Sequence, residues 1–212
     1  MSARWYWVLV VSLVAASATS ALAQEKNEIG GMLGRTFVSD QGIKGATFFD
    51  PVIHFGKGIT MEGNYARRFL ITPLYSISGE VVGAYNPDQD LNGGVYGSAV
   101  VPSDYKAFFI TPAARLNLFP TTAVSPWVSF GAGFGHFSEG SNLVYGGTNP
   151  GKSTTNAVIQ GGLGLDVKLA GHFLIRGEVR DFWSGEPDFP LADTGKSRQH
   201  NYFVAGGVVW RF

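Results

Sequence analysis

The sequence contains no cysteine, and only 15% of its 212 residues are charged. The absence of cysteine excludes disulfides and thiolate metal sites. Soluble domains usually contain about 25% charged residues, so this chain is poor in charge for a soluble protein. Its formal net charge of +0 argues against a nucleic-acid partner, because a surface that binds phosphates normally makes a domain clearly basic.

Long apolar runs are also missing. Beyond Gln24, no stretch holds the roughly 18 uninterrupted apolar residues of a membrane-spanning helix. Glycine is abundant, with 29 residues, and aromatic residues make up 14% of the chain. These features favour a β-barrel over a helical membrane protein, and the length suits a single domain.

The N-terminus has the pattern of an export signal. Arg4 precedes an apolar stretch from Trp5 to Ala16, and Ala21-Leu22-Ala23 supplies a small-x-small cleavage pattern. These residues predict a signal peptide over residues 1–23 and a mature, exported domain over residues 24–212. An uncleaved N-terminal membrane anchor is the alternative interpretation.

The mature sequence alternates between apolar and polar residues with a period of two, which is typical of strands with two different faces. The C-terminal strand is the clearest, with apolar residues at even positions and Arg211 among the odd ones. The predicted strands cover residues 28–38, 58–69, 75–81, 110–119, 127–135, 158–168, 173–180 and 201–212. The phase of the first strand is not determined by its sequence.

The connections between these strands alternate between short and long. Short ones are expected at Ile71 to Pro73, Pro120 to Ser125, and Gly171-His172; long ones at Ser39 to Lys57, Asn86 to Tyr105, Gly140 to Thr154, and Gly185 to His200. Outer-membrane barrels have short periplasmic turns and long extracellular loops. The sequence therefore predicts an all-β fold, a single closed antiparallel transmembrane barrel of about eight strands.

Alternation alone does not say which face points outward, and a soluble ligand-binding barrel would place its apolar residues inside. The polar face is rich in glycine, as a narrow, filled lumen requires. Aromatic residues also gather near both strand ends, as they do at two membrane interfaces. The turn end has Phe69, Tyr75, Phe119, Trp127, Phe173, Trp210 and Phe212, and the loop end has Tyr85, Phe108, Phe182, Trp183 and Tyr202. The apolar face is therefore expected to meet lipid.

Charged residues on the polar face should then lie inside the lumen. The predicted charge network comprises Glu62, Arg68, Glu80, Arg115, Asp166, Lys168, Arg176, Glu178 and Arg180, and Arg211 also points inward. Because an eight-stranded barrel is wide enough only for its own side chains, we expect these charges to pair structurally. A narrow, low-conductance pore is the alternative.

The export signal, the opening EIGGMLGRTFV, the eight alternating strands and the terminal WRF resemble the OmpA-like small outer-membrane barrels. In that family, a C-terminal aromatic residue preceded by alternating apolar residues is the signal for the barrel assembly machinery. By this resemblance the signal is Tyr202, Val204, Val208, Trp210 and Phe212, interrupted by Gly206. The resemblance also implies contact with outer-membrane lipid and lipopolysaccharide.

His136-Phe137-Ser138 resembles the catalytic strand of the lipid A deacylases, in which the histidine is the base and the serine the nucleophile. Glu139 replaces that family's asparagine, no acid partner follows, and the pair lies on the fifth strand instead of the sixth. We therefore expect no catalytic residues and no enzyme activity.

Asp88-Gln89-Asp90 begins like a calcium loop but lacks the closing glutamate, so no metal or cofactor is expected. The long loops at 92–105 and 142–154 are rich in Tyr, Asn, Ser and Gly and could contact an extracellular ligand. The sequence thus predicts an outer-membrane barrel with a structural or surface-interaction role.

Overall fold

The computed structural model describes residues 25–42, 52–56, 58–93, 101–144, 146–150, 153–185 and 198–212. The predicted signal peptide lies outside these residues, as do parts of the long loops. Among the described residues, no helix is long and apolar enough to cross a membrane.

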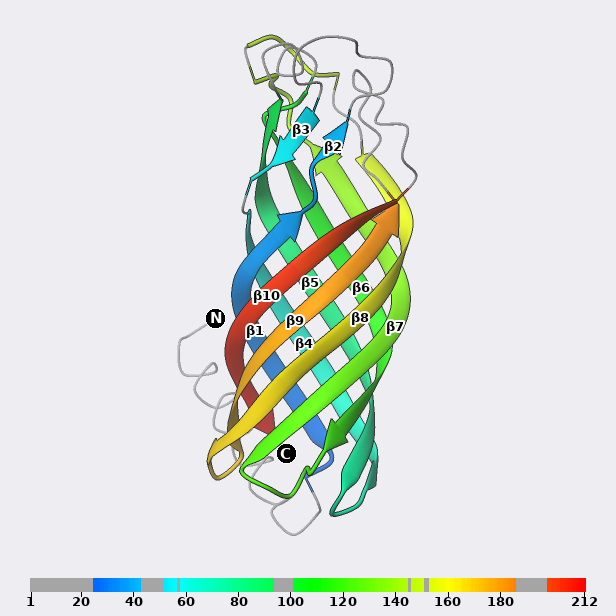
Figure 1. Cartoon of the computed structure of the whole chain (residues 1–212), viewed down its shortest axis with the longest axis vertical. Coiled ribbons are helices and arrows are strands. Elements are labelled where there is room, and N and C mark those ends of the chain that lie inside the picture. The colour runs from blue at the N-terminus through cyan, green and yellow to red at the C-terminus, as the bar shows by residue number, and fades with distance from the viewer. Residues whose placement is uncertain are drawn as a thin grey trace, which may run out of the picture.

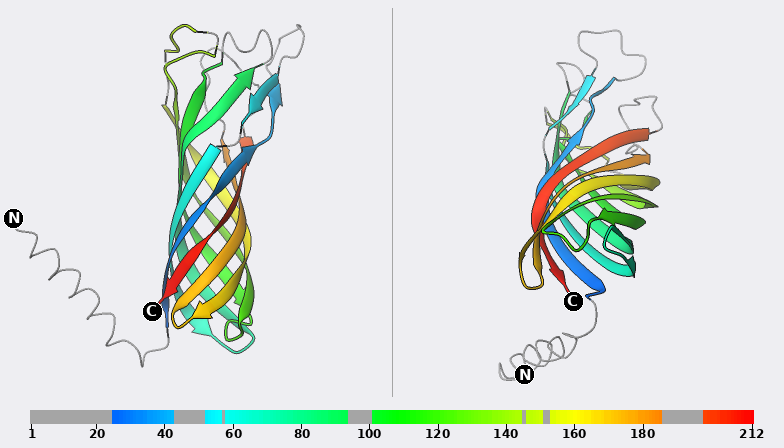
Figure 2. Two further views of the ribbon diagram at one scale, coloured as in Figure 1. Left: turned by 90° about the vertical axis from the view of Figure 1, so that its left-hand side faces the viewer. Right: turned by 60° about the horizontal axis from the view of Figure 1, so that its bottom comes forward.

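Eight strands close into an antiparallel barrel (Figures 1 and 2). They are β1 (Asn27–Val38), β4 (Gly58–Ile71), β5 (Tyr75–Gly93), β6 (Asp104–Leu118), β7 (Val124–Glu139), β8 (Ser153–Ala170), β9 (Phe173–Gly185) and β10 (Arg198–Arg211). Each strand pairs with its neighbours in this order, and β10 pairs with β1. Two short strands, β2 (Gln41–Gly42) and β3 (Val52–Phe55), lie at the loop end. They pair with each other, and β3 also pairs with the upper part of β5. The predicted fold class is confirmed.

The seam between β1 and β10 joins the two ends of the described chain. The backbone N–H of Asn27 donates to the carbonyl of Phe212, and the N–H of Phe212 donates to the carbonyl of Asn27, both at 2.8 Å. This pairing fixes the phase of β1, which its sequence left open. Glu28 is buried inside, whereas Ile29 and Leu33 face outward.

The strands extend further toward the loop end than the alternation predicted. The third predicted strand ended at Val81, but β5 continues to Gly93, and β6 begins at Asp104. The upper part of β5 contains Pro87, Asp88 and Asp90, residue types that are rare in strands. Cross-strand pairing with β6, with a register shift between Asn86 and Gln89, holds this part in the sheet.

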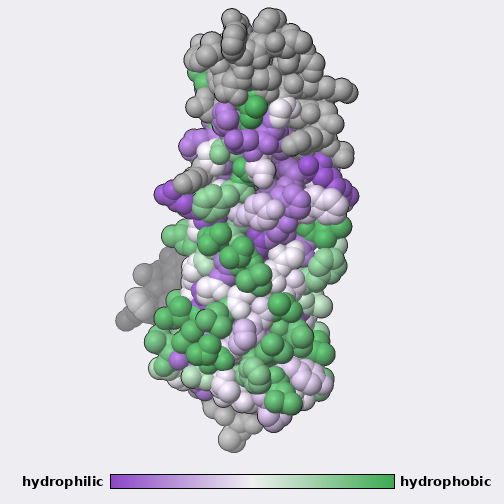
Figure 3. Space-filling view, in the orientation of Figure 1, coloured by the Kyte–Doolittle hydropathy of each residue, from purple (hydrophilic) through white to green (hydrophobic). Residues whose placement is uncertain are grey.

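The outer wall of the barrel is apolar. Phe69 and Phe130 are 72% and 67% exposed, and large aliphatic residues are exposed on all eight barrel strands. Figure 3 shows this apolar belt over the lower part of the barrel, with hydrophilic side chains above it. Exposing so much apolar surface to water would be unfavourable for a soluble barrel, whereas a barrel in a membrane requires an apolar outer wall against the lipid.

Two aromatic residues expected at the membrane interfaces instead lie inside. Trp127 is 2% exposed and Phe182 is 1% exposed. Phe182 continues the inward alternation of Arg176, Glu178 and Arg180 on β9, so strand parity outweighs closeness to the strand end. Trp183, its neighbour, is on the outer wall as expected.

Candidate functional site: the charged lumen

Within the described residues, the lumen holds ten buried charged side chains, which we call the charge cluster. All four acids that were predicted to point inward are buried, and so is Glu28. Of the six predicted bases, the five arginines are buried and Lys168 is not, so the cluster has five acids and five arginines. The members are Glu28, Glu62, Glu80, Asp166, Glu178, Arg68, Arg115, Arg176, Arg180 and Arg211. This equal number of opposite charges satisfies the requirement that a buried charge has a partner.

Glu28 is the residue with the most ion pairs in the cluster. Its carboxylate accepts hydrogen bonds from Arg115, from Arg176 Nη2 at 3.3 Å and from Arg211 Nε at 2.9 Å. The Nε of Arg68 lies 3.7 Å away. Glu28 was not predicted from the sequence, because the glycines of the first strand hide which of its faces is apolar. The apolar residues at the odd positions 29, 33 and 37 are the signal that would have placed the even-numbered Glu28 inside.

Arg180 on β9 is the second centre of the cluster. It donates to Glu80 at 2.9 Å and to Glu178 at 3.1 Å, and its Nε lies 3.3 Å from Glu62. Glu80 also accepts from Arg115 at 3.3 Å, which connects the two centres. Acids from three different strands therefore converge on a single guanidinium.

Trp127 on β7 packs among the arginines. The guanidinium carbons of Arg115, Arg176 and Arg180 lie 5.7, 5.2 and 5.0 Å from its ring centre. Its indole N–H donates to Asp166 at 3.1 Å, and Arg176 holds the same carboxylate through Nε and Nη2 at 2.7 and 2.8 Å. With Trp127, all eight barrel strands contribute to the cluster and its packing.

Lys168 does not join the cluster, contrary to the sequence-based prediction. Its side chain is exposed near the β8–β9 turn. The pairing of β8 with β9 shifts register between Lys168 and Ala170. Lys168 itself lies before this shift and pairs with the buried Leu174, so it keeps its inward parity, but it lies close to the end of β8, where its side chain is exposed.

Above the charge cluster, toward the loop end, the lumen is filled by an aromatic layer of Tyr105, Phe109, Phe137, Phe182 and Phe203. The rings of Phe109 and Phe182 stack with centroids 4.8 Å apart, and Phe109 meets Phe137 edge to face at 5.6 Å. The sequence did not predict this layer: Phe182 was assigned to the membrane interface and Tyr105 to a long loop, and the predicted strands began after Phe109 and ended before Phe137. The lumen thus holds the charge cluster nearer the turns and the aromatic layer nearer the loops, where the buried polar residues Gln160 and Asn201 are the register partners of Phe182.

Gly164 makes room for Trp127. A Cβ atom at Gly164 would lie 2.5 Å from Cζ2 of Trp127 and 2.6 Å from the carbonyl oxygen of Gly177. We expect Gly164→Val to lower the free energy of unfolding by about 1–3 kcal/mol through overpacking. Urea unfolding in lipid vesicles measures this, and Gly161→Val is the control because a Cβ at Gly161 meets nothing within 4 Å. Equal stability of the two variants would contradict the close packing.

The His136-Ser138 pair does not form a catalytic arrangement. The ring of His136 is exposed on the outer wall, and its Nδ1 is hydrogen-bonded to Thr155 Oγ1 at 2.8 Å. Ser138 lines a polar pocket of about 340 Å³ with Asp104 and Lys106, and His136 is not part of that lining. No hydrogen bond joins the two within the described part of the chain.

The residues predicted as the assembly signal occupy the outer face of β10. Tyr202, Val204 and Val208 are exposed, and the rings of Trp210 and Phe212 stack at 4.6 Å. The long loops at 92–105 and 142–154 are described only in part. Among the described residues, no group of three or more His, Cys, Asp or Glu is placed to hold a metal ion.

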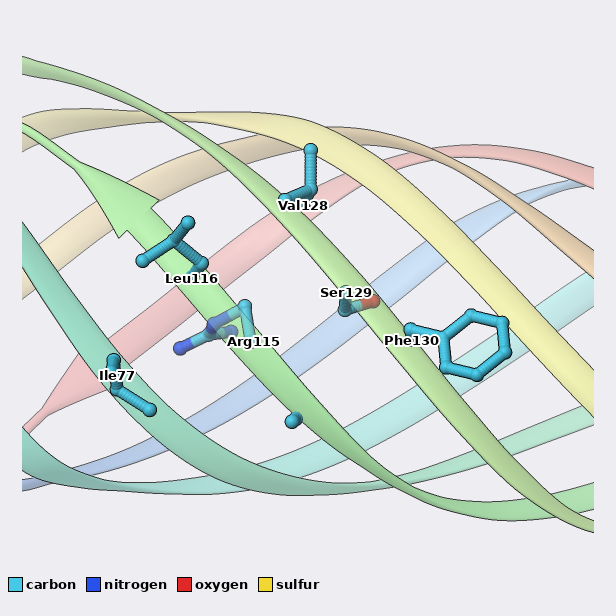
Figure 4. A pocket seen from close by; sticks show the side chains of 7 residues that line it. Ile77, Arg115, Leu116, Val128, Ser129 and Phe130 are labelled. Carbon is cyan, nitrogen blue, oxygen red and sulfur yellow. The ribbon is translucent and has the colours of Figure 1, made fainter.

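The apolar belt carries a groove of about 400 Å³ on its outer surface. Figure 4 shows its lining side chains, which include Ile77 on β5, Leu116 on β6 and Phe130 on β7. The small Ala114 lies among these larger residues. An apolar groove in this position fits lipid chains better than a polar substrate.

Solved structures with this barrel come from several outer-membrane proteins. Neisserial surface protein A has a TM-score of 0.56 at 13% identity, over 88% of this chain and 97% of that one. OprG from Pseudomonas aeruginosa has a TM-score of 0.57 at 16% identity, over 89% and 97%. The N-terminal barrel of Pseudomonas aeruginosa OprF has a TM-score of 0.51 at 13% identity, over 89% and 98%. At these identities the likeness concerns the fold.

A search of curated protein sequences finds no match. The family model for the outer membrane protein beta-barrel domain, however, matches residues 7–212. That match spans nearly the whole sequence, and the alternation, the closed barrel and the apolar belt are those of such a domain. The chain therefore belongs to the outer membrane protein beta-barrel domain family.

Proposed function

We propose that this protein is a non-enzymatic, non-conducting barrel of the outer membrane, with a structural or surface-interaction role. The filling of the lumen carries this proposal. Five acids and five arginines form a network of ion pairs nearer the turns, and the aromatic layer together with buried polar side chains such as Gln160 and Asn201 fills the lumen toward the loops. An eight-stranded barrel has room only for such a filling, which supports a scaffold and leaves interaction to the outer wall and the loops.

Planar-bilayer recording tests this proposal. We expect the refolded protein to give no discrete conductance steps at high protein load, because ions would have to displace paired buried charges. The alternative, a narrow pore, predicts steps whose size changes in Arg115→Ala or Glu80→Gln, since both side chains line the lumen and pair with each other. Steps that respond to these substitutions would overturn the non-conducting assignment.

The absence of enzyme activity is tested on lipid A. We expect the lipid A species of cells that express the protein to be the same for wild type and Ser138→Ala by mass spectrometry. A deacylated species that depends on Ser138 would establish the enzyme alternative. The exposed position of His136 and its bond to Thr155 support the non-enzymatic assignment.

Export and assembly form part of the same proposal. Residues 1–23 serve as the signal peptide, and the outer face of β10 with Phe212 contacts the barrel assembly machinery. The outward exposure of Tyr202, Val204 and Val208 supports this role, because a second protein could reach them before lipid surrounds the barrel.

A further inference from the structure

The acids and arginines of the charge cluster are equal in number but unevenly distributed along the lumen. Nearer the turns, four arginines share two acids, and nearer the loops, three acids share one arginine. The turn-end group is Arg68, Arg115, Arg176, Arg211, Glu28 and Asp166. The loop-end group is Arg180 with Glu62, Glu80 and Glu178. Arg115 also pairs with Glu80 and so joins the two groups, but the turn-end group still holds two positive charges in excess.

The turn-end group also contains buried hydrogen-bond donors that no described acceptor uses. Nη1 of Arg176, Nε of Arg68 and the hydroxyl of Ser78 have no hydrogen-bond partner among the described residues, and the same holds for Ser76, two residues along the inward face of β5. All four side chains are more than nine-tenths buried. A buried donor without an acceptor is unfavourable, so this part of the lumen favours an acceptor that the described chain does not supply.

Sheet register and shared contacts place these donors in one part of the lumen. Ser78 on β5 is the register partner of Arg68 on β4 and of Arg115 on β6, so it lies between the two guanidinium side chains. Arg115 and Arg176 both donate to Oε2 of Glu28. The Nε of Arg68 lies 3.7 Å from Oε1 of the same carboxylate. The unpaired donors of Arg68, Ser78 and Arg176 therefore lie around one point.

This point is reached from the turn end. Arg68 and Arg211 are 6% and 7% exposed, whereas the other two arginines of the group are almost completely buried. Glu25 at this entrance offers Arg68 its backbone carbonyl, while its carboxylate is held by His172 at 2.8 Å and acts on Arg68 only at longer range. Toward the loops, the aromatic layer fills the lumen. A ligand must therefore be small and must enter from the periplasmic side.

We propose that the turn-end group binds one small inorganic anion, chloride under physiological conditions, between Arg68, Ser78 and Arg176. Guanidinium N–H and serine O–H groups donate to an anion, and hydrogen bonds that involve a charged partner are the stronger ones. Two excess positive charges exceed the charge of one chloride, so the anion lowers the repulsion among the arginines without replacing Glu28 or Asp166. A single atom also fits a filled lumen better than a phosphate with four oxygens. This site does not depend on the proposed scaffold role, because an anion binds at the turn end whether or not the lumen conducts.

Iodide quenching of Trp127 tests the site. The ring of Trp127 is 2% exposed and its centre lies 5.2 Å from the guanidinium carbon of Arg176, so iodide bound in the group contacts the indole, whereas iodide in bulk water does not. The variant Trp183→Phe/Trp210→Phe keeps Trp127 as the single tryptophan of residues 24–212. In this parent variant we expect quenching that saturates with iodide and is reversed by chloride, but not by gluconate at the same ionic strength.

Ser78→Ala in this background is the informative substitution. Its hydroxyl has no partner among the described residues, so its removal breaks no hydrogen bond of the fold. We expect the heat-dependent gel shift of a folded barrel to persist and iodide to bind at least about tenfold more weakly, the equivalent of about 1.4 kcal/mol. Ser184→Ala is the matched control, because Ser184 is a buried lumen serine nearer the loops that is bonded to Asn201 at 3.0 Å. It should bind iodide like the parent. Should Ser78→Ala not fold, Arg68→Gln replaces it with the same expected weakening.

Two results would overturn the anion site. Quenching of Trp127 that rises linearly with iodide and is not reversed by chloride would show that no anion binds in the group. Equal iodide affinity in the Ser78→Ala and Ser184→Ala variants would show that these donors do not hold the anion and that water is their partner. Conductance recordings of the same samples report on the lumen separately. Conductance steps together with saturable quenching would overturn the non-conducting assignment and leave the anion site in place.

Discussion

Glu28→Gln is expected to destabilise the barrel by about 3–5 kcal/mol, the usual cost of removing one partner from a buried ion-pair network. The substitution keeps the size of the side chain but removes the negative charge that Arg115, Arg176 and Arg211 share. The cluster would then hold five arginines and four acids. Urea unfolding in lipid vesicles, followed by tryptophan fluorescence, measures the change.

Glu25→Gln is the matched control for this prediction. Glu25 pairs with His172 at 2.8 Å, but both side chains are partly exposed at the periplasmic mouth. Solvent screens such a pair, so its loss should change the free energy of unfolding by about 0–1 kcal/mol. Glu28→Gln and Glu25→Gln variants of equal stability would show that the charge cluster does not depend on Glu28.

Phe182→Ala is expected to lower the free energy of unfolding by about 3–5 kcal/mol. Its ring is 1% exposed and stacks on Phe109 at 4.8 Å. Removing the ring leaves a cavity inside the lumen, which lipid cannot enter. The same urea titration in vesicles, together with the temperature at which the folded gel band is lost, measures the effect.

Phe130→Ala provides the comparison. Phe130 is 67% exposed on the outer wall, where lipid chains can occupy the space that its ring leaves. We expect a smaller loss than for Phe182→Ala, because only the transfer of the ring into lipid is lost and no cavity remains. A larger loss for Phe130→Ala would contradict the view that the aromatic layer is a packed core.

The faces of the strands could be predicted from the sequence because alternation with a period of two is a local property. Arg115, Arg176 and Arg180 are inward by parity alone, and the structure buries all three. Trp127 lies two residues before the buried Ser129, so the same parity gives it an inward position, although its closeness to a turn pointed to the membrane interface. Where these two indications disagreed, strand parity gave the correct side.

The pairing of the charges could not be predicted from the sequence. Glu28 and Arg115 meet across the lumen, and their contact depends on the tilt and stagger of the strands, which no single strand encodes. The upper parts of β5 and β6 were also missed. They extend beyond the apolar belt, so the membrane no longer imposes an alternation, and Pro87 and Asp88 read as loop residues.

The position of Glu28 on the first barrel strand also constrains how the barrel forms. Its partner Arg211 lies 183 positions away, at the opposite end of the sequence. Because β1 also pairs with β4, an open sheet already contains Glu28, but it holds Glu28 and Arg211 on opposite edge strands. Ring closure is therefore the step that brings Arg211 to Glu28. Contacts so distant in sequence form slowly, and we expect folding to be cooperative, without a stable open-sheet intermediate.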